Sequence, residues 1–181
     1  MRPLHAFDLW KWVADNRQAF EPPVGNKVIW EDSQFTAMVI RGPNGRRDFH
    51  VDPSDEIFYM LRGDMVVETM RDGQREDLVV REGELLLVPA FTPHSPHRPA
   101  DTWGLVVEVK RPPDQKESLL WFCDRCNALL HEVTMHVADI ETELRRAIEA
   151  FDASVALRTC AACGHVQPDR PPIPTAPPAR P

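Results

Sequence analysis

The sequence has 181 residues, enough for one domain with a hydrophobic core and a small appendage. Its 43% hydrophobic and 27% charged residues are typical of a soluble globular protein, and its net charge of −7 argues against nucleic acid as a partner, because phosphate binding needs clustered Lys and Arg. No apolar run approaches the ~20 residues of a membrane span, and the first residues lack a secretory signal's apolar stretch. We therefore expect a cytoplasmic protein with no membrane partner.

The chain is predicted to begin with a helix and to continue as short strands. Apolar residues at helical spacing predict a helix over residues 5–20, which Pro22 and Pro23 terminate because the residue before a proline avoids the α region. Strands are expected at 27–30, 35–41, 48–51, 56–61, 64–70, 77–80, 84–88 and 105–110. Many short strands at close spacing indicate a mainly β protein, an antiparallel sandwich or barrel.

The last third of the sequence differs in composition. Arg111-Pro112-Pro113-Asp114 resembles a linker, and apolar positions 140, 144, 147, 148 and 151 predict a helix over 140–151. The last fourteen residues contain seven prolines and are expected to be disordered or polyproline-like. We therefore predict a β domain over 1–111, a cysteine module over 112–167 and a proline-rich tail over 168–181.

Two segments of the β domain carry candidate metal ligands. They resemble the two cupin motifs, with candidate ligands at His50, Glu56 and His94 and further matches at Gly63, Gly83 and Pro89. Two positions depart from that pattern: Asp52 replaces the second histidine of the usual His-x-His pair, and Phe91 replaces a usual glycine. Two histidines and one carboxylate leave coordination positions open and suit an Fe(II) that binds substrate and O2 together.

Strand periodicity supports this interpretation independently. Glu56, Phe58 and Met60 share one face of their predicted strand, and a carboxylate on an apolar face needs a partner such as a metal. Alternatively, His50 and His94 are ordinary strand-end histidines and Glu56 is a surface charge. The coincidence of all three at these offsets favours the metal site, to which Asp52 could add or substitute a ligand.

Two arginines and a second glutamate are candidate pocket residues. Arg46 lies four residues before His50 and Arg98 four after His94, so in extended segments each arginine points to the side of its histidine. Arginine binds carboxylates through two parallel hydrogen bonds. Glu108 lies in an apolar strand, where an unpaired charge is costly. Solvated arginines and a Glu108 paired with a surface lysine are an equally good interpretation of the pattern alone.

The four cysteines form two Cys-x-x-Cys pairs, Cys123/Cys126 and Cys160/Cys163. Two such turns can complete a tetrahedral thiolate site, and this spacing in a chain expected in a reducing compartment favours metal over disulfides. Either zinc or iron suits four thiolates. A site without open positions is expected to be structural.

These features together resemble the bacterial type of the 3-hydroxyanthranilate 3,4-dioxygenase family from about residue 5 to 168. The resembling stretches include Gly25-Asn26-Lys27, Asp48-Phe-His50, Glu56-Ile-Phe-Tyr59 and His94-Ser-Pro-His-Arg98, together with the paired cysteines. The resemblance implies a cupin double-stranded β-helix with an N-terminal helix, a C-terminal rubredoxin-like four-cysteine module and a homodimer. It favours iron over zinc at the cysteines.

The resemblance also implies residue roles. His50, Glu56 and His94 would hold catalytic Fe(II), and Arg46 would lie at the O2 site. Arg98 and Glu108 would bind the substrate carboxylate and its neighbouring polar groups, while Glu56 also faces the substrate. Asn26 and Asp48 would be pocket or supporting residues.

The implied activity is ring cleavage of 3-hydroxyanthranilate by O2 to 2-amino-3-carboxymuconate semialdehyde, the precursor of quinolinate in NAD synthesis from tryptophan through the kynurenine pathway. The alternatives are another cupin-type Fe(II) dioxygenase acting on a small carboxylate-bearing substrate, a cupin sugar isomerase, and a non-catalytic ligand-binding cupin. Two pocket arginines and the four-cysteine module argue against a different cupin reaction.

Overall fold

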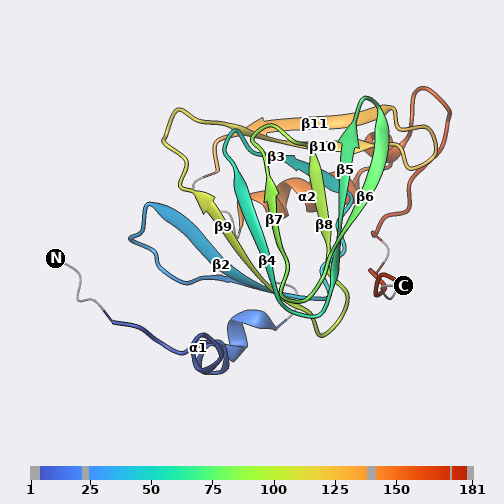
Figure 1. The fold of residues 1–181 in the computed structure, drawn as a ribbon. Helices are drawn as coiled ribbons and strands as arrows, with labels where there is room; N and C mark the ends of the chain where they lie inside the picture. Colours follow the sequence, from blue (N-terminus) through green and yellow to red (C-terminus); the bar gives the residue numbers. More distant parts are fainter. Residues whose placement is uncertain (1–4, 22–24, 138–141, 172, 179–181) are drawn as a thin grey trace.

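The computed structural model describes residues 5–21, 25–137, 142–171 and 173–178, and it consists mainly of two antiparallel sheets packed face to face (Figure 1). The first sheet has the order β1 (Asn26–Val28), β2 (Phe35–Arg41), β9 (Trp103–Val109), β4 (Glu56–Arg62) and β7 (Leu85–Val88). The second has the order β11 (Leu129–Met135), β10 (Glu117–Phe122), β3 (Asp48–Val51), β8 (His94–His97), β5 (Met65–Arg71) and β6 (Gln74–Val80). This architecture confirms the predicted mainly β fold of antiparallel strands.

The core between the sheets is formed by the apolar positions of alternating strands. In β4 the side chains of Phe58 and Met60 are buried on the same face as Glu56, as the strand periodicity predicts. They pack against Met65 and Val67 of β5 in the opposite sheet. Each such burial contributes roughly 1.5–3 kcal/mol to folding, so this cluster fixes the separation of the sheets and the depth at which Glu56 lies.

The N-terminal helical segment covers the outer face of the first sheet. It comprises α1 (Leu9–Asp15) and the 3-10 helix η1 (Arg17–Phe20), and it lies outside the sheets beside β2 (Figure 1). The helix begins later than predicted because the Asp8 side chain caps it, accepting a hydrogen bond of 2.9 Å from the Lys11 backbone N–H. Val13 and Phe20 pack against Val39, so the helical segment covers this part of the sheet.

Two strands that the sequence did not indicate connect the cysteine segment to the barrel. Strand β10 pairs with β3, with Leu119 opposite His50, and β11 extends the same sheet (Figure 1). Helix α2 (Glu143–Ala153) packs on β10 through Phe151, and α3 (Val155–Arg158) follows it. The first residue of the predicted helix, Ile140, lies outside the described residues. The predicted boundary between a β domain and a cysteine module at residue 111 stays a prediction.

The glycines of the two cupin motifs occupy turns with left-handed backbone. Gly63 has φ 68° and Gly83 has φ 80°, a conformation that glycine adopts without steric cost. Phe91 has φ 62° at the position where the motif usually has glycine. The chain thus keeps the left-handed turn despite the side chain, and the following strand β8 begins at His94 as the site requires.

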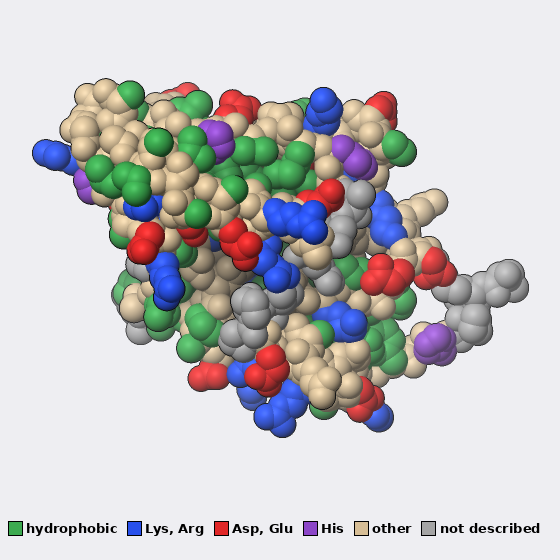
Figure 2. Space-filling model, turned by 180° about the vertical axis from the view of Figure 1, so that it is seen from behind, with side chains coloured by type: hydrophobic (Ala, Val, Ile, Leu, Met, Phe, Trp, Pro, Cys, Tyr) green, Lys and Arg blue, Asp and Glu red, His purple; other side chains and the backbone are tan. Residues whose placement is uncertain are grey.

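The proline-rich tail has no helix or strand in residues 168–171 and 173–178, and its predicted disorder stays a prediction. Arg47 donates a hydrogen bond of 2.6 Å to the Pro168 carbonyl, which attaches the start of the tail to the barrel. Acidic and basic side chains are interspersed over the rear face (Figure 2). No helix among the described residues is long and apolar enough to cross a membrane.

Candidate metal centres

Strand register brings the predicted ligands of the barrel together. His50 of β3 lies directly opposite His94 of β8, and Glu56 of β4 lies directly opposite Glu108 of β9. The two pairs belong to different sheets and face each other across the interior. As a result, ligand atoms of His50, Glu56 and His94 all lie within 4.8 Å of one another, and all three side chains are buried.

The geometry of these three side chains fits a bound cation. Glu56 Oε1 lies 3.3 Å from His50 Nδ1 and 3.3 Å from His94 Nε2. Within the described part of the chain this buried oxygen has no hydrogen-bond donor, which is costly unless a cation lies against it. Burial works to raise the pKa of Glu56, but the adjacent His94 and His50 lower it well below its usual value. The carboxylate is therefore ionised and available as a ligand.

The second nitrogen of each histidine has a partner of its own. His50 Nε2 lies 2.9 Å from Glu117 Oε2, and His94 Nδ1 lies 2.8 Å from the Thr92 carbonyl oxygen. Such contacts fix the ring orientation and direct the other nitrogen to a metal. Sequence reasoning missed Glu117, although it shares strand parity with the buried Leu119 and Trp121, which marks it as a buried carboxylate.

A cavity of about 230 Å³ opens over the three ligands. Its walls include four further residues expected from the sequence, which are Asn26, Arg46, Arg98 and Glu108. Asp48 contacts Arg46, with 3.0 Å between Asp48 Oδ2 and Arg46 Nε. His97 pairs with Glu68 at 3.6 Å instead, as its opposite strand parity predicts. The sequence thus identified residues that the fold gathers around one cavity.

Arg98 is a buried cation in this cavity with vacant hydrogen-bond donors. Its side chain is 1% exposed, and among the described residues neither Nε nor Nη1 has an acceptor. Burial and the like charge of Arg46 lower the pKa of Arg98 to about 10, so it remains charged at neutral pH. A Cβ at position 104 would lie 3.3 Å from Arg98 Nε, so Gly104 leaves the guanidinium room. The arrangement suits a bound carboxylate.

Glu108 differs from Arg98 because it has a partner. It is buried, and both its oxygens contact Arg111, at 3.1 Å to Nη1 and 3.2 Å to Nη2. Burial raises the pKa of Glu108 to about 7, against the opposing effect of Arg111. The alternative of a Glu108 paired with a surface lysine does not describe this geometry.

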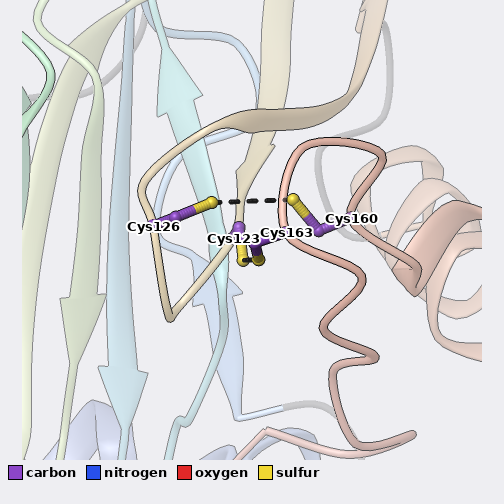
Figure 3. Close-up of side chains that lie close together, drawn as sticks. All are labelled: Cys123, Cys126, Cys160 and Cys163. Atoms are coloured by element: carbon purple, nitrogen blue, oxygen red, sulfur yellow. Dashed lines mark hydrogen bonds between the residues drawn. The ribbon is translucent and has the colours of Figure 1, made fainter.

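The four cysteines form a second candidate metal centre outside the barrel. Two turns face each other, one with Cys123 and Cys126 and the other with Cys160 and Cys163 (Figure 3). The Sγ atoms are 3.7 Å apart for Cys123 and Cys163 and 3.6 Å for Cys126 and Cys160, well beyond the ~2.05 Å of a disulfide. The Cys163 backbone N–H lowers the pKa of Cys160 to about 7, which favours the thiolate. The arrangement suits a tetrahedral metal.

Known proteins resemble this chain over most of its length. The model of the 3-hydroxyanthranilic acid dioxygenase family matches residues 1–152. The 3-hydroxyanthranilate 3,4-dioxygenase of Bacillus thuringiensis is 48% identical over 169 residues, 93% of this chain and 94% of that protein. The enzyme of the same name from Neurospora crassa is 41% identical over 157 residues, 87% of each chain.

Among solved structures, a cupin-2 domain containing protein from Shewanella frigidimarina is 17% identical, with a TM-score of 0.43 over 54% of this chain and 91% of that one. The family match covers most of the sequence, including every candidate ligand of the barrel. The chain therefore belongs to the 3-hydroxyanthranilic acid dioxygenase family.

Proposed function

We propose that this dioxygenase uses Fe(II) to convert 3-hydroxyanthranilate and O2 to 2-amino-3-carboxymuconate semialdehyde, with both oxygen atoms retained in the product. Relatives at 48% and 41% identity carry the name of this activity. The observation that carries the proposal is the juxtaposition, in one cavity, of a buried two-histidine, one-carboxylate group and the buried Arg98, whose Nε and Nη1 lack acceptors among the described residues.

The residues proposed to hold the iron are His50, Glu56 and His94. When bound there, Fe(II) would supply open coordination positions for the adjacent hydroxyl and amine of the substrate and for O2. Glu117 and the Thr92 carbonyl keep the two imidazoles oriented.

The pocket residues bind and orient the ring. Arg98 would bind the substrate carboxylate through two N–H groups, which fixes the ring carbon presented to O2. Arg46, partly buried and charged, would stabilise negative charge that develops nearby. Glu108 would accept a hydrogen bond from the amine or hydroxyl, with Glu56 beside it and Asn26 on the pocket wall.

The four-cysteine centre is proposed to hold a second, structural iron in a rubredoxin-like arrangement, zinc being the alternative. Its turns are fixed to the barrel because Arg75 of β6 donates hydrogen bonds to Asn127 Oδ1 at 3.0 Å and to the Phe122 carbonyl at 3.1 Å. Four thiols in metal spacing also support a reducing, cytoplasmic location. The product is proposed to close to quinolinate and to feed NAD synthesis.

A homodimer is proposed on the outer face of β4 and β7. Ile57 pairs with Leu87 and Tyr59 with Leu85 across these strands, so their side chains form one row. Leu85 is 70%, Leu87 55% and Ile57 41% exposed. An apolar patch of neighbouring side chains on a sheet is the kind of surface that a twofold interface buries.

The proposed function is tested by loading the purified protein with Fe(II) without oxygen and then adding 3-hydroxyanthranilate and O2. We expect one O2 consumed per substrate and absorbance of the ring-opened product. His94→Ala should abolish turnover and remove one metal per chain while the four-cysteine metal remains. His97→Ala, a histidine of the same strand that pairs with Glu68, is the matched control. No O2 uptake by iron-loaded wild type would exclude the proposal.

A further inference from the structure

Arg111 is a buried arginine surrounded by three buried carboxylates. It is the second residue after β9, and its side chain is 4% exposed. Its Nη2 lies 2.5 Å from Asp52 Oδ2, its Nη1 lies 3.1 Å from Glu108 Oε1, and its Nε forms an ion pair with Glu117. The segment that resembles a linker in the sequence thus supplies the cation at the centre of this cluster.

The cluster adjoins the proposed iron ligands. Ligand atoms of His50, Asp52 and Glu117 lie within 4.8 Å of one another, and so do those of Asp52, Glu56 and Glu108. Asp52 therefore lies beside the proposed ligands, within 4.8 Å of His50 in the first group and of Glu56 in the second. It also occupies the position at which the cupin motif usually supplies a further histidine ligand.

The contacts of Arg111 oppose that additional ligation. Asp52 Oδ2 is held by Arg111, and Asp52 Oδ1 accepts a hydrogen bond of 2.7 Å from the Ser54 backbone N–H, so coordination of a cation by Asp52 would cost one of these contacts. Arginine holds several carboxylates at once through its planar, five-donor fork, which lysine cannot reproduce. The Glu117 oxygen paired with Arg111 is also the one that contacts His50 Nε2, so the same contacts direct His50 Nδ1 toward Glu56.

We propose that Arg111 is a positioning residue that withholds Asp52 from the catalytic metal and thereby limits the protein ligands to His50, Glu56 and His94. This inference rests on the proposed function, because open coordination positions matter only if substrate and O2 share the metal. With Asp52 as a ligand the site would have four protein ligands, and without it the site has three. The ion pair with Arg111 keeps the number at three.

Co(II) in place of iron provides a readout independent of activity. Each spectrum is recorded with that of His94→Ala subtracted, so that cobalt in the four-cysteine site cancels. Wild type and Asp52→Asn should give the same visible bands. Arg111→Met should give weaker, shifted bands, as expected when an additional carboxylate raises the coordination number, and a Co(II) affinity altered by about tenfold or more. In the Arg111→Met/Asp52→Asn protein the wild-type bands should return.

A folded Arg111→Met protein with the wild-type spectrum overturns the inference, and so does a double variant whose bands fail to return. If Arg111→Met does not fold, Arg111→Lys replaces it, with a shift in the same direction expected and an unchanged spectrum as the overturning result. Arg81→Met, which removes a partly buried ion pair with Asp64, is the matched control for losing an arginine. Absence of any difference between wild type and His94→Ala would instead contradict the proposed function.

Discussion

At the scale of single residues, the pocket contains buried charged side chains that lack hydrogen-bond partners for some of their polar atoms. Arg98 and Glu56 are both buried, and the described residues leave Arg98 Nε and Glu56 Oε1 without hydrogen-bond partners. Polar atoms of this kind are rare in folded proteins because they cost stability. Two of them, of opposite charge and in one cavity, indicate that a cation and an anionic group complete the site.

Replacing Arg98 tests the anionic half of that conclusion. Arg98→Met keeps the side-chain length and removes the charge, so KM for 3-hydroxyanthranilate should rise by at least about tenfold, the effect of losing a charged hydrogen bond worth roughly 1.5–3 kcal/mol. Metal content, measured by atomic emission, should not change. Arg98→Lys should recover part of the affinity, since lysine keeps the charge without the fork. A KM equal to that of wild type would contradict the proposal that Arg98 binds the substrate carboxylate.

At the scale of elements, β10 links the two metal centres. Its inner face carries Glu117, which contacts His50, and its far end leads into the turn that holds Cys123 and Cys126. Trp121 of the same strand stacks on Phe151 of α2 at 4.7 Å between ring centroids and 14° between planes. Because β10 pairs with β3 as well, the cysteine segment and the barrel share one sheet.

Truncating Trp121 should therefore destabilise the protein strongly. The side chain is fully buried, and deletion of a buried tryptophan leaves a cavity, so Trp121→Ala should lower the free energy of unfolding by about 3–5 kcal/mol. Urea unfolding of the metal-loaded protein measures the change. Leu129→Ala on the neighbouring strand, where the side chain is 52% exposed, should change it by less than about 0.5 kcal/mol. If Trp121→Ala lowered the free energy of unfolding by less than about 1 kcal/mol, the packing of Trp121 on Phe151 would contribute little to stability.

At the scale of the whole molecule, two parts of the outer face of the first sheet differ in how they are covered. The outer face near β2 is covered by α1 and η1, whereas the row over β4 and β7 leaves Leu85 and Leu87 exposed. A second copy of the chain would cover this row in the proposed homodimer.

Charges placed on that row should separate the subunits. Leu85→Lys/Leu87→Lys should convert a dimer to a monomer in sedimentation velocity, because burying lysines without partners is costly. The fold should persist, since both positions are exposed in the single chain. Leu129→Lys on the other sheet is the matched control and should stay dimeric. A wild-type protein that is monomeric at micromolar concentration, or a double variant that remains dimeric, would contradict this interface.

Much of the fold was predictable because its signals are local. Strands β2 and β3 begin and end where the sequence predicted, since residues that favour strands and the flanking turns define them. Strand β8 was missed because Pro93, Pro96 and Pro99 punctuate the segment, and its pairing with β3 and β5 overrides that local signal. Strands β10 and β11 were not predicted, because they are held in the sheet by pairing of β10 with the distant β3 and of β11 with β10.

The sequence by itself determined the metal-ligand types, the left-handed glycine turns and the parity that directs Glu56 inward, because each depends on neighbours a few residues away. Only the tertiary structure decided that His50 faces His94, that Glu117 supports His50 and that Arg111 forms ion pairs with Asp52, Glu108 and Glu117. The physical reason is that the cost of a buried charge is set by all the groups around it. Those groups come from strands whose register is fixed by packing across the whole barrel.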